Sequence, residues 1–359
     1  MFIRKITEND NPILMAYYNE EFDKFCQLID DGEENINAVD DMGYSIKDNI
    51  IFHFKNRKNN KDYFDKILSC ENYIPNIGCA SNLSLALKYQ EIEYARDLLK
   101  NGCDVEHTPK EDSPPIFHAL STGNKEKINL ILSHNPILTR TSETGYTILN
   151  SLFLTQPKLV DSYLQILIDK GADPKQINSN GRHPLHLLRE KCDIRKTISI
   201  FQKYGVDVNC MDQDKVTPLM SASYMNRKDV VIALIENNAT INHKNKDGMT
   251  ALLFSAKKES YDVLKILIEN NANVFDVNIN GNNMAHILII SSETSPVKTA
   301  SDQMLQFLTE HSDIMEIPNK LNLTPMQLFE STRKKKCYQK LKKMITNKKN
   351  KLKNNELIK

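Results

Sequence analysis

Cysteine and histidine are the residues of this chain whose side chains could carry out covalent chemistry. The 359 residues include seven Cys and nine His, and a thiol that lies beside an imidazole can serve as an enzymatic nucleophile. Two such pairs could form in the folded chain, Cys192 with His183 and Cys79 with His118. Nothing in the local sequence marks either thiol as activated, so a cysteine hydrolase is the weakest of the functional alternatives.

Motifs for metal, phosphate and serine chemistry are missing from the sequence. The Cys residues form no C-x-x-C pair and are odd in number, which is typical of reduced thiols in a cytosol-like compartment. His183 and His186 are three residues apart, but no further ligand follows at a zinc spacing. There is neither a glycine-rich phosphate loop nor a G-x-S-x-G elbow. We therefore expect no catalytic residue, no metal ion, no cofactor and no small-molecule substrate.

The elements that position these side chains belong to a sequence repeat. Segment 216–222 (VTPLMSA) returns as segment 249–255 (MTALLFS), and self-similarity at such a period is typical of a stacked array in which neighbours supply each other's core. Taking Leu219 and Leu252 as anchors predicts ten units over residues 1–346, with degenerate capping units at 11–80 and 279–346. The anchors are Ile13, Lys47, Leu83, Ile116, Leu149, Leu185, Leu219, Leu252, Ala285 and Met326.

Each unit is predicted to contain a short helix, a loop and a second, bulkier helix. Thr217 supplies an N-cap oxygen and Pro218 fills the first helical position, where no donor is lost. Gly or Asn is expected in left-handed conformation at the end of each second helix. A second Gly opens the turn before most first helices. Cys79, Asp112, Lys215 and Asn322 replace it in the other units, where we expect distorted turns.

The repeat resembles the ankyrin repeat over roughly residues 11–346. The family pattern D-x-x-G-x-T-P-L-H-x-A-A, followed by G-A-D-V-N, is similar to segments 180–186 (NGRHPLH) and 205–209 (GVDVN). The resemblance implies an all-α solenoid whose hairpin fingers project beside a concave palm. It also implies that His186 and His286 tie neighbouring turns together by hydrogen bonds. The interval before Met326 is longer than the others, and we expect an inserted loop at about 291–301.

Partners of ankyrin proteins contact the hairpin tips and the exposed ends of the first helices, so the resemblance implies a protein partner here. Tyr224 and Met225 are large apolar residues where solvent is expected. They either contact a partner or cover a neighbouring unit. Transferred by register, the predicted contact residues are Tyr146, Asn180, Arg182, Asp214, Val216, Tyr224, Met225, Lys246, Asp247, Met249, Lys257 and Lys258.

The net charge of +1 conceals a basic C-terminus. Residues 333–359 carry twelve Lys or Arg and one Glu. We expect residues 347–359 to form a disordered tail. The tail could attract an anionic membrane surface, bind nucleic acid, or only keep the array soluble. The basic residues assigned to the membrane alternative are Lys348, Lys349, Lys351 and Lys353.

Composition and the N-terminal sequence indicate the cellular location of the protein. No apolar run approaches the ~18 residues that a membrane span requires, and residues 1–10 lack the apolar region of a secretory signal. We therefore expect a cytoplasmic protein. Richness in Asn, Lys and Ile, together with degenerate repeats, is similar to ankyrin-repeat effectors of intracellular bacteria, which act in the host cytosol. Large DNA viruses also carry degenerate arrays, often closed by an F-box-like segment that this sequence lacks.

Overall fold

The computed structural model describes residues 11–32, 46, 50, 60–70, 82–89, 92–106, 112–294, 302–332 and 335–357. Within these ranges the ordered elements are helices, and no strand is present. The all-α class is therefore confirmed. The chain divides into two compact units, Met1–Ser179 and Asn180–Lys359, and each is described by itself.

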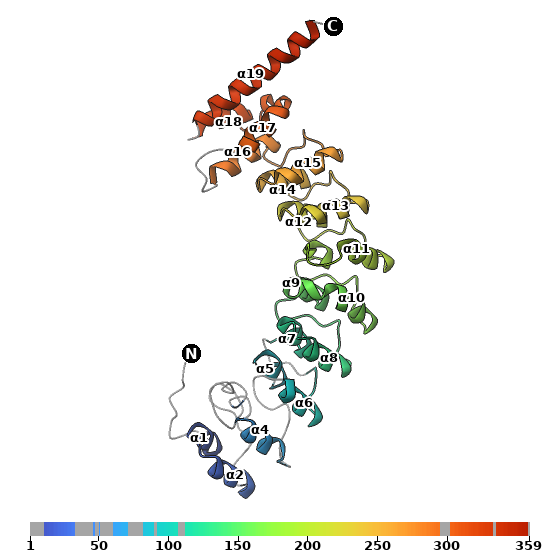
Figure 1. Cartoon of the computed structure of the whole chain (residues 1–359), viewed down its shortest axis with the longest axis vertical. Helices are drawn as coiled ribbons and strands as arrows, with labels where there is room; N and C mark the ends of the chain where they lie inside the picture. The colour runs from blue at the N-terminus through green and yellow to red at the C-terminus, as the bar shows by residue number, and fades with distance from the viewer. Residues whose placement is uncertain are drawn as a thin grey trace. The chain divides into compact units, whose positions relative to one another are not determined.

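The first unit is built from consecutive helix pairs. The first helices of successive pairs pack on one another, α5 on α7 and α7 on α9, and among the second helices α6 packs on α8 (Figure 1). Its elements are α1 (Pro12–Tyr18), α2 (Phe22–Asp31), α4 (Asn60–Leu68), α5 (Asn82–Tyr89), α6 (Ile92–Lys100), α7 (Pro115–Thr122), α8 (Lys125–Ser133), α9 (Ile148–Thr155), η2 (Pro157–Leu159) and α10 (Val160–Asp169).

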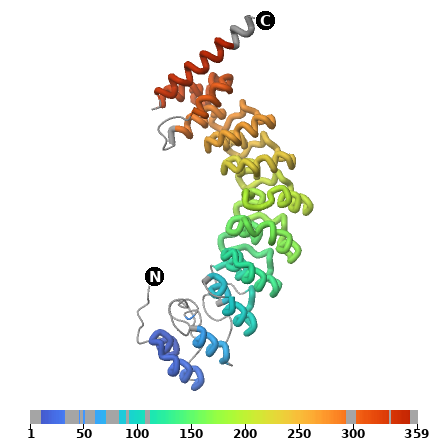
Figure 2. The backbone as a smooth tube through the Cα atoms, viewed as in Figure 1, coloured from blue at the N-terminus to red at the C-terminus, as the bar shows by residue number. Residues whose placement is uncertain are grey.

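The second unit repeats this arrangement. One row is formed by η3, α12, α14, α16 and α18, and the other by α11, α13, α15, α17 and α19 (Figure 2). Its elements are η3 (Pro184–Leu187), α11 (Ile194–Lys203), α12 (Pro218–Tyr224), α13 (Lys228–Glu236), α14 (Ala251–Lys257), α15 (Tyr261–Glu269), α16 (Met284–Thr294), α17 (Asp302–Glu310), η4 (Ser312–Glu316), α18 (Pro325–Ser331) and α19 (Lys335–Leu357).

The described anchors are buried in the core of their unit, except Met326, which is half-buried. Leu219 and Leu252 take the second position of α12 and of α14, and both are fully buried. The hydroxyl of Thr217 accepts a hydrogen bond from the Met220 backbone at 3.3 Å, and Thr250 caps α14 in the same way. Neighbouring repeats therefore bury equivalent residues, as the periodicity predicts. Lys47 lies outside the described residues.

The expected distortion of the turns at Lys215 and Asn322 is wrong. Both residues adopt the left-handed conformation that Gly takes elsewhere, each with a φ of 57°. The Lys215 backbone donates to Asp212, and that of Asn322 donates to Asn319, as the Gly248 backbone donates to Asn245. The hairpin geometry is thus kept, at the cost of a strained φ for a residue with a Cβ.

The sixth pair departs from the predicted pattern. Its first helix is only the 3₁₀ turn η3. The turn ends at Leu188, whose backbone is no longer helical, with φ −48° and ψ 136°. The Leu188 carbonyl accepts a hydrogen bond from the guanidinium of Arg227 in the next pair. Residues 188–193 consequently form a loop, which ends where Asp193 caps α11.

Residues 291–294 and 347–357 are helical, where the sequence predicts an inserted loop and a disordered tail. Helix α16 continues to Thr294, and the Ser292 hydroxyl within it donates to the Ile289 carbonyl. Residues 295–301 lie outside the described residues. Helix α19 runs unbroken to Leu357, so residues 347–357 are helical where disorder was expected. The physical reason is a contact of Lys348 with α17, described below.

Candidate recognition surface

The hairpin tips of the second unit are held by one repeated side chain. The buried Asn245 side chain accepts hydrogen bonds from the backbones of Asp247 and Met249, at 3.0 and 2.8 Å. Asp212, Asn278 and Asn319 make the same pair of bonds in their own hairpins. Each tip is therefore a rigid turn whose exposed side chains are presented on an ordered backbone.

Backbone hydrogen bonds join one tip to the next. The Lys246 backbone donates to Asp214 at 3.1 Å, and the Ile279 backbone donates to Asp247 at 2.9 Å. The Gln213 backbone donates to Asn180 and continues the row. Side chains on neighbouring tips thus keep a fixed spacing, which lowers the entropy lost when a partner binds.

The two predicted histidines do link neighbouring repeats. His186 Nε2 lies 2.9 Å from the Val216 carbonyl oxygen, and His286 Nε2 lies 2.8 Å from that of Leu323. Burial lowers the pKa of both imidazoles, so each is neutral near pH 7 and donates one N–H to its carbonyl. Their role is to hold the hairpins in place.

The predicted tip residues differ in exposure. Asn180, Arg182, Asp214, Lys246 and Asp247 are exposed, while Tyr146 and Val216 are half-buried. Arg182 pairs with the buried Asp212 at 3.1 Å, and Lys246 lies 3.7 Å from Asp214. Met249 is only 7% exposed, so its assignment as a contact residue is corrected. Its sulfur accepts a hydrogen bond from the Asn278 amide of the next hairpin at 3.9 Å.

Tyr224 and Met225 lie at the C-terminal end of α12 and differ from each other. Met225 is 55% exposed. Tyr224 is half-buried, because its ring lies edge-on to Phe254, 5.7 Å away, and under the ammonium of Lys258 at 4.3 Å. Lys257 is exposed beside it. Tyr224 therefore covers the neighbouring repeat in part, while Met225 is open to solvent.

Apolar tip residues were missed by the sequence analysis. Ile279 is 52% exposed and Leu321 is 76% exposed, on adjacent tips joined by the Lys320 backbone bond to Asn280. Extending the register of Lys246 by one repeat gives Ile279, and extending that of Asp247 by two repeats gives Leu321. They add an apolar segment to a surface on which mixed charge was expected.

Comparison with known proteins agrees with this geometry. The family model described as ankyrin repeats (3 copies) matches residues 158–245 and again residues 189–278. The chain contains ankyrin repeats. It is 26% identical over 167 residues to an ankyrin repeat protein of Fowlpox virus (strain NVSL), a match that covers 44% of this chain and 47% of the relative. The chain thus spans about half the length of the curated relative it matches.

The thiols of the ankyrin array show no activated pair among the described residues. The Cys192 thiol donates to the Arg189 carbonyl at 3.3 Å, whereas His183 Nδ1 accepts from the Leu185 backbone. His118 pairs with Asp112 at 2.9 Å, and Cys79 lies outside the described residues. Within the described ranges, no group of three or more His, Cys, Asp and Glu side chains could hold a metal ion.

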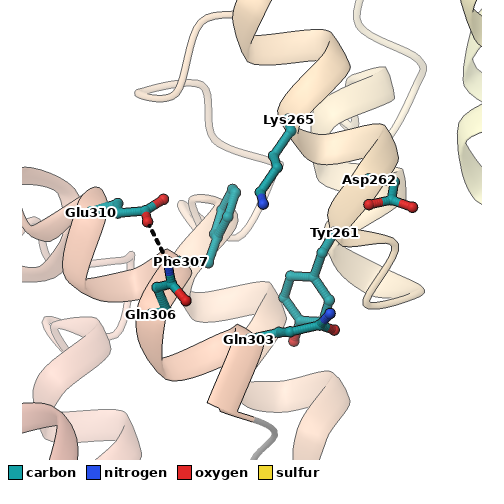
Figure 3. Close-up of a pocket in the computed structure, with 7 residues that line it drawn as sticks. All are labelled: Tyr261, Asp262, Lys265, Gln303, Gln306, Phe307 and Glu310. Carbon is teal, nitrogen blue, oxygen red and sulfur yellow. Dashed lines mark hydrogen bonds between the residues drawn. The ribbon is translucent and has the colours of Figure 1, made fainter.

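A small cavity lies between α15 and α17 of the ankyrin array (Figure 3). Its volume of about 40 Å³ is far below the ~300–1,000 Å³ of typical small-molecule sites. The rings of Tyr261 and Phe307 form part of its wall, and the Gln306 amide donates to Glu310 at 3.0 Å. Such a cavity has room for ordered water.

The basic residues of the predicted tail do not all face solvent. Lys348 is half-buried, and its ammonium donates to the carbonyls of Glu310 at 2.7 Å and Thr309 at 3.0 Å. Lys349 lies 3.7 Å from Glu316, and Lys351 is exposed. The side chain of Lys353 lies outside the described part. Among the described helices, none is both long and apolar enough to cross a bilayer.

Proposed function

We propose that this protein is a non-catalytic scaffold that captures a protein partner through the hairpin tips and first-helix ends of its second unit. The observation that carries the proposal is Met225, whose apolar side chain is open to solvent on a rigid helix end. Beside it, Tyr224 is braced by Phe254 and Lys258. Large, pre-organised apolar groups of this kind are the usual energetic centres of protein interfaces.

The exposed polar residues supply the rim of this proposed interface. Arg182, Asp214, Lys246 and Asp247 project from tips that are hydrogen-bonded to one another. Both positive and negative side chains occur on the rim. The rim would therefore select partners by the arrangement of their charges more than by their net charge. The apolar tips Ile279 and Leu321 extend the same surface.

Affinity purification with a matched variant tests the proposal. The triple variant Arg182→Ala/Tyr224→Ala/Met225→Ala is compared with wild type in cross-linked pull-downs from a eukaryotic lysate. The control is Ile166→Ala, which removes an exposed apolar side chain from α10 in the first unit. We expect the triple variant to lose about tenfold or more of the specific partner, and the control to keep it. Equal recovery by the triple variant and wild type would refute this interface.

We further infer that the partner is a host protein and that the scaffold acts as an effector in a host cytosol. Support comes from the unpaired cysteine usage and from similarity to a protein of a virus. A bacterial source has no support from that comparison. Fusion to a reporter enzyme that works only in host cytosol tests delivery during infection. A fusion that accumulates in the producing cell but gives no reporter signal in host cells would refute the effector role.

A second candidate function rests on α19. Lys342, Lys343, Lys349 and Lys351 are exposed on one helix, and basic residues near an anionic bilayer each contribute about 1 kcal/mol. The tail could thus tether the scaffold to a membrane. Co-sedimentation with phosphatidylserine vesicles tests this. Lys343→Gln/Lys351→Gln should lower the bound fraction, and vesicles of phosphatidylcholine alone should bind neither protein. Equal sedimentation of variant and wild type would exclude the tether.

A further inference from the structure

Arg189 lies in the loop that replaces a first helix and forms no ion pair with a carboxylate in the described part of the chain. Its guanidinium Nε is buried and has no hydrogen-bond partner. No salt bridge from Arg189 to any described carboxylate is found. Buried donors are normally satisfied, and an arginine presents a planar fork that matches a carboxylate. Arg189 as a whole is only half-buried, so its side chain can still take an acceptor that arrives from outside.

A second arginine makes the local charge more positive. Arg227 is half-buried in the turn after α12, and its guanidinium is held by the Leu188 carbonyl. Burial and the nearby positive charge of Arg189 lower the pKa of Arg227, while the exposed Glu190 raises it. Glu190 is thus the one described acid that offsets the pair, and it makes no hydrogen bond to Arg189. Two cations and one acid leave the surface around Arg189 and Arg227 with a net positive charge, which favours binding of an anion.

Arg189 and Arg227 lie close to the C-terminal end of α12, where Met225 is exposed. Arg227 follows Met225 by two residues, and Met225 is next to Tyr224, whose ring carries the Lys258 ammonium at 4.3 Å. Lys257 is exposed at the end of α14. The first-helix ends of the sixth, seventh and eighth repeats therefore present cations on either side of an open apolar residue.

We propose that this surface binds an acidic segment of the partner protein, with an Asp or Glu carboxylate on Arg189 and a large apolar side chain on Met225. The proposal rests on the proposed scaffold function and adds the chemistry of the bound segment. Charge complementarity selects the occupant: the groups facing it are Arg189, Arg227, Lys257 and Lys258, with Glu190 as the opposing charge. A basic or purely apolar segment would leave the Arg189 guanidinium without an acceptor.

Selection from a display library of short random peptides, with the full chain as bait, tests the proposal. The baits are wild type, Arg189→Gln and Arg195→Gln. Arg195 is a matched control because it is an exposed arginine on α11 that already pairs with Glu236. Circular dichroism checks that each bait is folded. An enriched peptide and its analogue with Gln in place of Glu are then compared by fluorescence anisotropy.

The expected result is an excess of Asp and Glu beside a large apolar residue among peptides enriched on wild type and on Arg195→Gln. The Gln analogue should bind wild type about tenfold more weakly than the acidic peptide does. Arg189→Gln should lose that preference and bind both peptides equally, and Arg189→Lys should restore part of it. Enriched peptides without an acidic excess, or an excess that survives Arg189→Gln, would overturn the proposal.

A fourth bait, Tyr224→Ala/Met225→Ala, separates this proposal from the scaffold function on which it rests. Peptides that depend on Tyr224 and Met225 but show no acidic preference would leave the scaffold interface standing and remove the role of Arg189. If neither the peptides nor the cross-linked partner depend on Tyr224 and Met225, both proposals fail together.

Discussion

The Nζ atom of Lys348 lies 2.7 Å from the carbonyl oxygen of Glu310, the last residue of α17. A second bond reaches Thr309, so one ammonium satisfies two carbonyls that a helix end leaves without partners. The contact also places a positive charge at the negative end of a helix. It explains why α19 continues through a lysine- and asparagine-rich segment.

Removing this contact should loosen α19. Lys348→Gln is expected to lower the free energy of unfolding of the last repeat by about 1 kcal/mol, because the carbonyls lose a charged donor. Hydrogen exchange of the α19 amides beyond Ile345 measures the effect. Lys351→Gln is the control, since Lys351 is exposed. Equal exchange in the two variants would show that Lys348 does not hold the helix.

Stability should fall as the pH drops below neutral. Burial lowers the pKa of His186 and His286 in the folded chain, so between that pKa and the ordinary value of ~6.5 the unfolded chain binds more protons. The free energy of unfolding therefore decreases as pH falls through this range. The thermal midpoint measured at about pH 7.5 and about pH 5.5 should show this loss.

Histidine variants identify the source of that pH dependence. His286→Gln is expected to have a lower midpoint at both pH values but a smaller difference between them, because one titrating group is gone. His134→Gln replaces an exposed histidine and should keep the wild-type difference. If His286→Gln kept the full difference, protonation of other groups would be responsible.

The left-handed turn at Gly145 should tolerate substitution worse than that at Gly171. A Cβ at Gly145, where φ is 75°, would lie 2.6 Å from the Ser179 Cβ, whereas a Cβ at Gly171 meets nothing within 4 Å. Gly171→Ala is expected to cost about 1–2 kcal/mol from its positive φ alone. Gly145→Ala should cost more, because the tip must also shift. Urea denaturation of both variants gives the comparison, and similar losses would contradict the clash.

Cys210 should be among the least reactive thiols. Burial, with a smaller contribution from Asp207, raises its pKa to about 12, so its thiolate fraction at neutral pH is about a thousandfold below that of an unperturbed thiol. Alkylation by iodoacetamide, followed residue by residue with mass spectrometry, measures the rates. A different thiol that reacts far faster than its companions would revive the cysteine hydrolase alternative.

Local features of the fold could be predicted because they depend on neighbours in sequence. Thr217 caps the helix it precedes, and Asn238 and Asn271 adopt positive φ at the ends of their helices. His186 and His286 were assigned through the repeat register, which specifies the adjoining hairpin as well. In each case a short motif and its period contain the necessary information.

Burial and long-range pairing could not be predicted in the same way. Met249 and Val216 occupy equivalent tip positions, yet Met249 is buried and Val216 is half-buried. The Met249 sulfur accepts a hydrogen bond from the Asn278 amide of the next hairpin at 3.9 Å, a contact between repeats. The 3₁₀ turn η3 likewise ends at a carbonyl taken by Arg227, 39 residues away.

The sequence by itself determined the repeat, its helix pairs and the turns between them, because caps, glycines and apolar spacing act within a few residues. Only the tertiary structure decided which of the displayed side chains remain open. Among the described residues, it left the buried Arg189 Nε without a hydrogen-bond partner, exposed Met225 and bound Lys348 to α17. These outcomes depend on contacts between side chains of neighbouring repeats. The periodic pattern of the sequence does not specify such contacts, because it is the same whether or not they form.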